Sequence, residues 1–212
     1  MTISAGQFVK LNLGCAGQVV DGWINVDYAL GARLAKIPFL RVLNRKLRLF
    51  DLDWDQRIYL HDLSKPFPWA DNTIDIVYSS HALEYFSRDD GRKFIAECYR
   101  VLRKDGILRL VQHDLRYIVV EYIEGRIRAD NFLEHLGVRY GSNKSVLKDR
   151  LAPFIQFPLR CIYDAPTLLQ ILGQAGFDVA IKAPFESAIG DIRNVELQGR
   201  TEHAIIIEGR RR

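Results

Sequence analysis

The sequence predicts an α/β protein built on a doubly wound, mostly parallel sheet, and three observations carry that prediction. An apolar strand over 8–14 runs directly into a tight turn of small residues that begins at Gly14. A second apolar run, 23–26, is followed at once by an acid, Asp27. Two further apolar runs, 59–63 and 73–80, also end in polar residues. Ligands bind at the carboxyl ends of strands in open α/β sheets, so these endings predict one binding edge.

The turn and the acid have a defined chemistry. Gly14 lacks a side chain and can take a positive φ angle, so the backbone there can approach a ligand closely. A carboxylate at the end of the neighbouring strand, such as Asp27, can accept hydrogen bonds from both hydroxyls of a ribose. Only 13 positions separate Gly14 from Asp27. We therefore expect half of a nucleoside-binding crevice and, over 18–22, a turn in place of a full helix.

The middle of the chain continues the alternation of strands and helices. A third strand covers 59–63, a proline-rich loop covers 65–69 and a fourth strand covers 74–78. Ser87 is the expected N-cap of a helix whose apolar face runs to Leu102. We expect this helix to end at 104–106, because basic residues and a glycine are typical of helix C-termini. A fifth strand follows at 107–111.

The last third of the chain is predicted to contain an insertion and the strands at the other edge of the sheet. After the fifth strand the pattern loosens, and residues 115–127 can form a helix. A helix over 166–175, preceded by Asp164 as cap, leads to an antiparallel pair of strands at 177–182 and 204–208. The three final arginines, 210–212, are predicted to be a frayed tail. The whole chain, 1–212, is thus expected to be one domain with seven strands.

The composition of the chain limits the cellular compartments and the binding partners that we expect for it. The chain has 212 residues, a formal net charge of +4 and 48% hydrophobic residues, which is ordinary for a globular protein. Apolar runs long enough to span a bilayer and the pattern of a signal peptide are both lacking. The three cysteines are too widely spaced for a disulfide framework or a zinc site, so we expect a reducing cytoplasmic setting and no metal. The mild charge does not favour a nucleic-acid partner.

One segment departs from this ordinary composition. Residues 33–48 carry six basic side chains and no acid, together with apolar residues at rough helical spacing interrupted by Pro38. This segment is either a core helix with a solvated basic face or a surface for an anionic membrane or a phosphate-bearing substrate. Oligomeric state is not indicated by the sequence.

Four stretches resemble the class I S-adenosylmethionine-dependent methyltransferases. They are LNLGCAG, GWINVD, LHDLSKPFPWADNTIDIVYSSHALEYF and ECYRVLRKDGILRLV, which cover 10–112 almost continuously. More narrowly, the chain resembles small methyltransferases associated with polysaccharide biosynthesis. The resemblance implies a Rossmann-like methyltransferase fold with a lid or substrate insertion over 114–160, after the fifth strand. One departure is Ala16, which stands where a glycine is common.

The resemblance also implies a cofactor, S-adenosylmethionine, and the residues that bind it. Backbone approach would come from Gly14, Cys15 and Ala16, and the ribose contact from Asp27. Asp62 and Leu63 would lie at the adenine, and Ser79 or Ser80 near the methionine end.

Candidate catalytic residues follow the fourth and fifth strands. His81 and His113 both lie at the predicted binding edge, where an imidazole could accept a proton from an attacking hydroxyl near neutral pH. Each could equally be a capping or packing histidine. A sulfonium cofactor already carries a good leaving group, so a base is needed only for an alcohol or neutral amine acceptor.

The sequence therefore predicts a cytoplasmic methyltransferase that acts on a small-molecule or sugar/glycan acceptor by direct methyl transfer. An alternative is a non-catalytic nucleoside-binding or partner subunit with the same fold, which the replacement at Ala16 leaves open. A nicotinamide-dependent oxidoreductase is less consistent, because it would need G-x-G-x-x-G and an acid about 20 residues further on.

Overall fold

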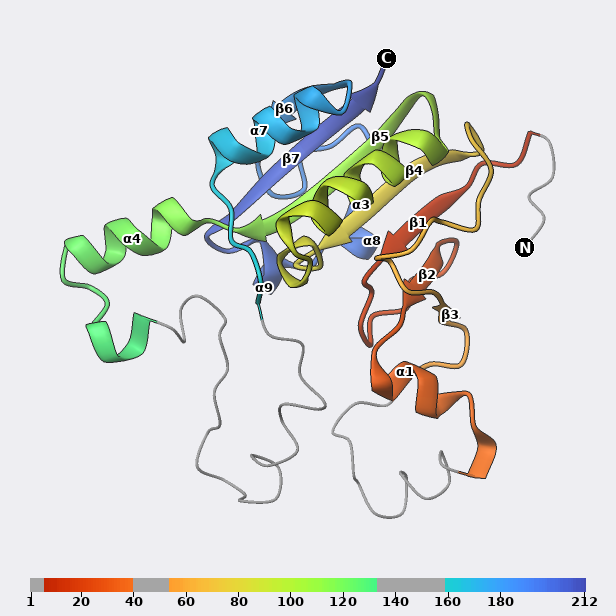
Figure 1. Ribbon diagram of the computed structural model, residues 1–212, viewed down its shortest axis with the longest axis horizontal. Coiled ribbons are helices and arrows are strands. Elements are labelled where there is room, and N and C mark those ends of the chain that lie inside the picture. Colours follow the sequence, from red (N-terminus) through yellow and green to blue (C-terminus); the bar gives the residue numbers. More distant parts are fainter. Residues whose placement is uncertain (1–5, 40–53, 133–158) are drawn as a thin grey trace.

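The computed structural model describes residues 6–39, 54–132 and 159–212, and its centre is a seven-stranded sheet (Figure 1). The strand order is β3-β2-β1-β4-β5-β7-β6. All neighbouring pairs from β3 to β5 are parallel, whereas β7 is antiparallel to both β5 and β6. The strands are β1 Lys10–Leu13, β2 Ile24–Asp27, β3 Tyr59–Leu60, β4 Ile74–Ser80, β5 Leu102–His113, β6 Phe177–Ile181 and β7 Ala204–Arg211. The predicted doubly wound, mostly parallel sheet is confirmed.

Helices pack on both faces of the sheet. On one face, α3 and α7 bury Phe94 and Leu168 in the larger apolar core. On the other face, α8 contributes Ile192 and Val195 to a second core. The helical elements are α1 Leu30–Ala35, η1 Leu83–Tyr85, α3 Arg88–Val101, α4 Leu115–Ile123, η2 Ala129–Asn131, α7 Ala165–Gln174, α8 Ile192–Val195 and α9 Gln198–Thr201.

Two predicted caps form as expected. The Ser87 hydroxyl accepts a hydrogen bond from the Asp90 amide at the start of α3, and the Asp164 carboxylate accepts one from the Thr167 amide at the start of α7. Each satisfies an amide that the helix itself leaves without a partner. Local sequence therefore determines where these two helices begin.

Side-chain hydrogen bonds shape the connection between β1 and β2, which has no helix, as the spacing predicted. The Asn25 side chain accepts from the Val20 amide and donates to the carbonyls of Val20 and Trp23. The neighbouring Asn12 donates to Asn25 Oδ1 at 3.0 Å. Both asparagines are buried, so their amides replace the backbone hydrogen bonds that a helix would have supplied.

The end of α3 differs from the prediction. The helix ends at Val101, and residues 102–106 open strand β5, where Leu102 pairs with Ile74 and the register shifts before Ile107. Gly106 therefore belongs to a bulge and not to a helix terminus. A Cβ atom there would lie 2.8 Å from the Arg103 carbonyl oxygen, so the position accepts only glycine without movement.

The predicted frayed tail is also wrong for two of its three residues. Arg210 and Arg211 belong to β7 and pair with Asp178 and Phe177 of β6. The Arg211 guanidinium lies over the Tyr99 ring, 4.8 Å from its centroid. Backbone pairing and this cation–π contact hold the end of the chain against the sheet.

Two predicted segments are only partly described. Of the basic segment 33–48, residues 40–48 lie outside the described residues, and of the expected lid 114–160, residues 133–158 do. The described part of the latter contains α4, which projects away from the sheet in Figure 1. Within the described ranges, no helix combines the length and the apolar character that crossing a bilayer requires.

Candidate functional site

The described residues enclose a cavity of about 930 Å³ at the carboxyl ends of the parallel strands. Most of its lining comes from the ends of β1, β2, β3 and β4 and the segments that follow them, as expected for the binding edge of an open α/β sheet. Six of the eight predicted cofactor residues line it: Gly14, Ala16, Asp27, Asp62, Leu63 and Ser80. The predicted catalytic residue His81 lines it as well.

The turn after β1 forms one wall. Gly14 has a φ angle of +71°, and a Cβ atom there would lie only 2.6 Å from the Ala82 Cβ atom. The position therefore requires glycine both for its conformation and for close packing. Ala16 also has a positive φ angle, +49°, which explains why glycine is the easier residue there.

Asp27 lies opposite this turn at the end of β2. Its carboxylate accepts hydrogen bonds from the Ala16 amide at 2.8 Å and from the Ala29 amide at 2.7 Å. One acid thus holds the loops that follow β1 and β2 on either side of the cavity. Each carboxylate oxygen keeps a further lone pair for a ligand hydroxyl.

The remaining predicted cofactor residues divide into two groups. Asp62 lines the cavity and uses one carboxylate oxygen to accept from the amide and the hydroxyl of Ser64. Cys15 and Ser79, in contrast, are buried and are not among the lining residues, and the Ser79 hydroxyl donates to the Leu13 carbonyl. Burial also raises the pKa of the Cys15 thiol to about 12. Any role of Cys15 in ligand binding is therefore limited to its backbone.

Two of the three arginines of the cavity, Arg160 and Arg200, were not indicated by the sequence. Arg33, Arg160 and Arg200 line it together with the acids. Arg200, from the short helix α9, is half-buried near Cys15 and Tyr78. It is distant from the other cavity residues in sequence, so only the folding of the segment before β7 brings it to this edge.

The two candidate catalytic histidines meet at the side of the cavity formed by the ends of β4 and β5. Their Nδ1 atoms lie 3.1 Å apart. The Glu84 carboxylate, from η1, is 2.8 Å from His113 Nδ1 and 3.5 Å from His81 Nδ1. His113 does not line the cavity itself but contacts His81, which does.

Glu84 is almost fully buried, with 1% of its side chain exposed, yet it is ionised. Burial alone would raise its pKa, but hydrogen bonds and charge interactions with His113 and His81 outweigh burial and lower the pKa to about 2. The His113 amide also donates to Glu84, at 2.7 Å. The cluster therefore combines a permanent negative charge with two imidazoles.

Hydrogen bonds distinguish the two imidazoles. His81 Nε2 lies 2.9 Å from the Arg200 carbonyl oxygen, which can only accept, so Nε2 carries a proton. Both nitrogens of His81 are thus engaged. His113, with 35% of its side chain exposed, uses only Nδ1 in the cluster. Glu84 follows His81 by three residues, and this H-x-x-E spacing is the one local signal in the sequence for their contact.

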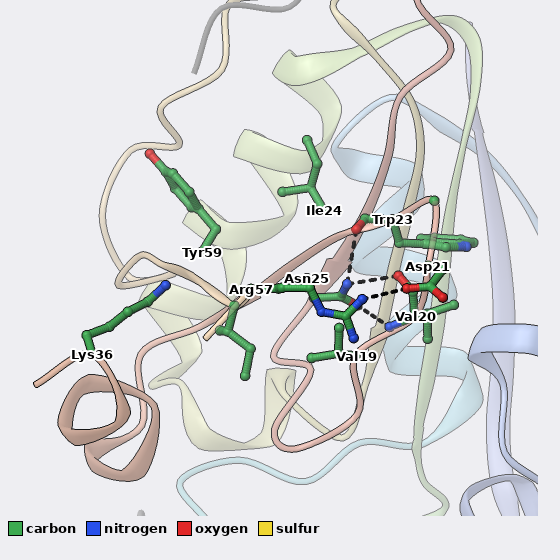
Figure 2. Close-up of a pocket in the computed structure, with 11 residues that line it drawn as sticks. Val19, Val20, Asp21, Trp23, Ile24, Asn25, Lys36, Arg57 and Tyr59 are labelled. Carbon is green, nitrogen blue, oxygen red and sulfur yellow. Dashed lines mark hydrogen bonds and ion pairs between the residues drawn. The ribbon is translucent and has the colours of Figure 1, made fainter. Parts of the chain in front are cut away.

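A second cavity, of about 400 Å³, lies beside β2 and β3 (Figure 2). Figure 2 shows that three of its polar side chains are already paired: Arg57 with Asp21, and Asn25 with the backbone of its own loop. This cavity is smaller, and its polar groups serve the β1–β2 connection. The larger cavity is therefore the candidate functional site.

The strand order of the sheet and the position of this cavity are those of the class I methyltransferase fold. Comparison with known proteins supports the same fold. Residues 33–110 match the profile of a family of methyltransferase domains. A SAM-dependent methyltransferase from Methanosarcina mazei is 15% identical, with a TM-score of 0.52, over 95% of this chain and 91% of that chain.

Two further solved structures are similar at the level of the fold. The YcgJ protein from Bacillus subtilis is 15% identical, with a TM-score of 0.51, over 97% of this chain and 92% of that chain. The second is a structure of a Haloferax volcanii complex between the Trm112 methyltransferase activator and a methyltransferase. It gives 13% identity and a TM-score of 0.50, over 96% of this chain and 82% of that chain. Comparison with curated proteins gives no significant match.

Proposed function

We propose that this chain is an S-adenosylmethionine-dependent methyltransferase that acts on a small-molecule or sugar/glycan acceptor by direct methyl transfer. The observation that carries the proposal is the pairing of Gly14 and Asp27 across one cavity at the ends of adjacent parallel strands. That pairing supplies close backbone approach and a ribose-binding carboxylate at the same edge. The family match over 33–110 supports the same reaction.

The cofactor requires little chemical assistance from the protein. Its sulfonium supplies an activated methyl group and an uncharged leaving group, so alignment of the acceptor with that methyl group provides much of the catalysis. Asp27 would hold the ribose, Asp62 and Leu63 the adenine, and Ser80 the methionine end. Arg200, half-buried at the same cavity, is positioned to pair with a carboxylate.

The acceptor would enter beside His81, which lines the cavity after the end of β4 and contacts His113 at the end of β5. An acceptor with a hydroxyl or a neutral amine would use this cluster, whereas a stronger nucleophile would not require it. The association with polysaccharide biosynthesis rests on the resemblance of the sequence alone. The cytoplasmic location rests on the spacing of the cysteines, and membrane or phosphate contacts through 33–48 rest on the charge pattern of that segment.

Calorimetry with S-adenosylmethionine, its demethylated product and NAD tests this proposal. We expect one site per chain for the first two ligands, with dissociation constants of micromolar order, corresponding to about 8 kcal/mol. We expect no heat from NAD. An absence of heat and of any thermal shift at millimolar cofactor would overturn the proposal.

Turnover then separates an enzyme from the alternative of a nucleoside-binding partner subunit. Transfer of labelled methyl from the cofactor to a mixture of nucleotide-linked and lipid-linked glycans would identify an enzyme. Binding without transfer to any of these acceptors, or to other small molecules, would favour the non-catalytic alternative.

A further inference from the structure

We propose that His81, Glu84 and His113 form a binding site for one divalent transition-metal ion. The prediction of no metal from the sequence rested on the three cysteines, whose spacing does not suit metal ligands. In the described part of the chain, however, two imidazole nitrogens and a carboxylate converge on one point from β4, η1 and β5. His113 is distant in sequence from His81 and Glu84, and the pairing of the adjacent strands β4 and β5 brings the three side chains together.

The spacing of the three ligand atoms fits an ion. The distances are 3.1 Å between the two Nδ1 atoms, 2.9 Å from Glu84 Oε1 to His113 Nδ1 and 3.5 Å from the same oxygen to His81 Nδ1. Metal–ligand bonds of about 2.0–2.2 Å place neighbouring ligand atoms about 2.8–3.1 Å apart in octahedral geometry and about 3.3–3.6 Å apart in tetrahedral geometry. The cluster therefore needs only small adjustments to accept an ion at its centre.

The groups around these ligands are arranged as in established metal sites. Histidine ligands commonly donate their second ring N–H to a carbonyl or carboxylate, which fixes the ring and leaves the other nitrogen as a ligand. His81 does this through Nε2–H to the Arg200 carbonyl at 2.9 Å. Glu84 is likewise fixed by the His113 amide.

The backbone conformation of His81 fits this arrangement. His81 has a φ angle of +51°, a left-handed conformation that histidine adopts more readily than most residues with a side chain. Here the conformation directs Nδ1 of His81 toward Glu84 and His113.

The donor set selects the class of ion. Two imidazoles and one carboxylate suit Zn²⁺, Fe²⁺ or Co²⁺, whereas Mg²⁺ and Ca²⁺ prefer oxygen ligands throughout. The buried Glu84 carboxylate offsets part of the charge of the ion. Three protein ligands leave coordination positions open, and the 35% exposure of His113 shows that one side of the cluster is accessible. In a step that rests on the proposed function, an oxygen or nitrogen atom of the acceptor would occupy an open position.

Metal binding can be measured without any enzyme assay. Tag-free full-length chain, stripped with a chelator, would be titrated with Co²⁺ and followed by visible absorption, and with Zn²⁺ and Mg²⁺ by calorimetry. We expect one Co²⁺ or Zn²⁺ per chain with a dissociation constant in the micromolar range or tighter, and no heat from Mg²⁺. Lack of stoichiometric Co²⁺ and Zn²⁺ binding, or binding of Mg²⁺ alone, would overturn the proposal whether or not the cofactor binds.

Variants assign the binding to this cluster. His113→Ala removes a partly exposed ligand, and Glu84→Gln keeps the shape of the buried side chain while removing its charge. We expect each to weaken Co²⁺ binding by at least about 100-fold, since even indirect partners of ligands contribute 10- to 100-fold. His203→Ala is the matched control, because His203 precedes the strand residue that pairs with His113 but stacks on Tyr117 outside the cluster.

The two variants must retain the fold for the comparison to hold, which circular dichroism would establish. If Glu84→Gln does not fold, the His113→Ala result decides, because that side chain contributes little to the core. Unchanged Co²⁺ binding in folded His113→Ala, or equal losses in His203→Ala, would place the metal elsewhere and contradict the proposal.

Discussion

Asp27 has two tasks at the residue scale. Its carboxylate fixes the amides of Ala16 and Ala29, and it also faces the cavity. The protein therefore orders both loops before any ligand arrives, which lowers the entropy cost of binding. Strand endings in the sequence were sufficient to predict this position, because an acid after a parallel strand must lie at the binding edge.

Replacement of Asp27 by alanine tests the proposed ribose contact. We expect Asp27→Ala to weaken binding of the demethylated cofactor by about 1.5–3 kcal/mol, the range for charge-assisted hydrogen bonds. Calorimetry measures this loss. Some stability will be lost too, because two backbone amides lose their acceptor, so the variant must be shown to be folded at the temperature used.

Asp21→Ala is the matched control for this measurement. Asp21 is an exposed acid whose contact is the surface ion pair with Arg57, and it lies outside the larger cavity. Its removal should leave cofactor affinity unchanged. Equal affinity in folded Asp27→Ala and in the parent chain would show that the ribose site is misplaced.

Cys15 yields a prediction about reactivity. Burial first, and then the charge of Asp27, raise the pKa of its thiol to about 12, whereas an exposed thiol ionises near pH 8.5. Because the thiolate is the nucleophile, Cys15 should resist iodoacetamide at pH 8.5 in the folded chain and react after unfolding in guanidinium. Mass spectrometry of the digested protein measures this. Rapid modification of Cys15 in the folded chain would refute the packing described around the turn.

Glu84 shows why part of the site could not be predicted. Its position three residues after His81 does not by itself indicate that its carboxylate is buried. Its burial depends on the pairing of β4 with β5, which brings His113 beside it. Pairing between strands more than 20 residues apart leaves no local pattern in the sequence.

At the scale of elements, a buried charge cluster joins β5 to the segment between β6 and β7. Arg109 of β5 is fully buried and pairs with Glu196 at the end of α8 and with Glu208 of β7. Its guanidinium also donates to the Glu186 carbonyl. This cluster fixes α8 and the chain that leads to α9, and thereby positions Arg200 at the cavity.

We expect Arg109→Met to destabilise the chain by about 3–5 kcal/mol, because two buried carboxylates lose their cation. Urea denaturation measures the free energy of unfolding. Arg103→Met, in the same strand, is the matched control: Arg103 forms a more exposed pair with Asp75, so its loss should cost about 1 kcal/mol or less. Similar losses in the two variants would contradict a structural role for the buried cluster.

Element boundaries were predictable to different degrees. Helix starts at Ser87 and Asp164 follow from side chains that cap the backbone locally. The end of α3 was not predictable, because Gly106 serves a bulge beside Asp75 on a neighbouring strand. A glycine that follows basic residues can mark either a helix C-terminus or a β-bulge, and the sequence is the same in both cases.

At the scale of the whole molecule, the order β3-β2-β1-β4-β5-β7-β6 gathers the ends of four parallel strands around one cavity. The seven strands were predictable from apolar runs and their polar endings. Sequence could not indicate the arginines that arrive from α9 and from residue 160. The proposed membrane or phosphate surface at 33–48 and the proposed lid over 114–160 remain predictions.

A crystal structure of the chain with demethylated cofactor tests the central claim most directly. The account predicts one molecule in the larger cavity, its ribose hydroxyls on the Asp27 carboxylate and its sulfur on the side of the cavity that His81 and His113 face. The backbone at Gly14 should lie in contact with the ligand. A ligand bound in the smaller cavity beside β2 and β3, or a ribose without contact to Asp27, would contradict the account.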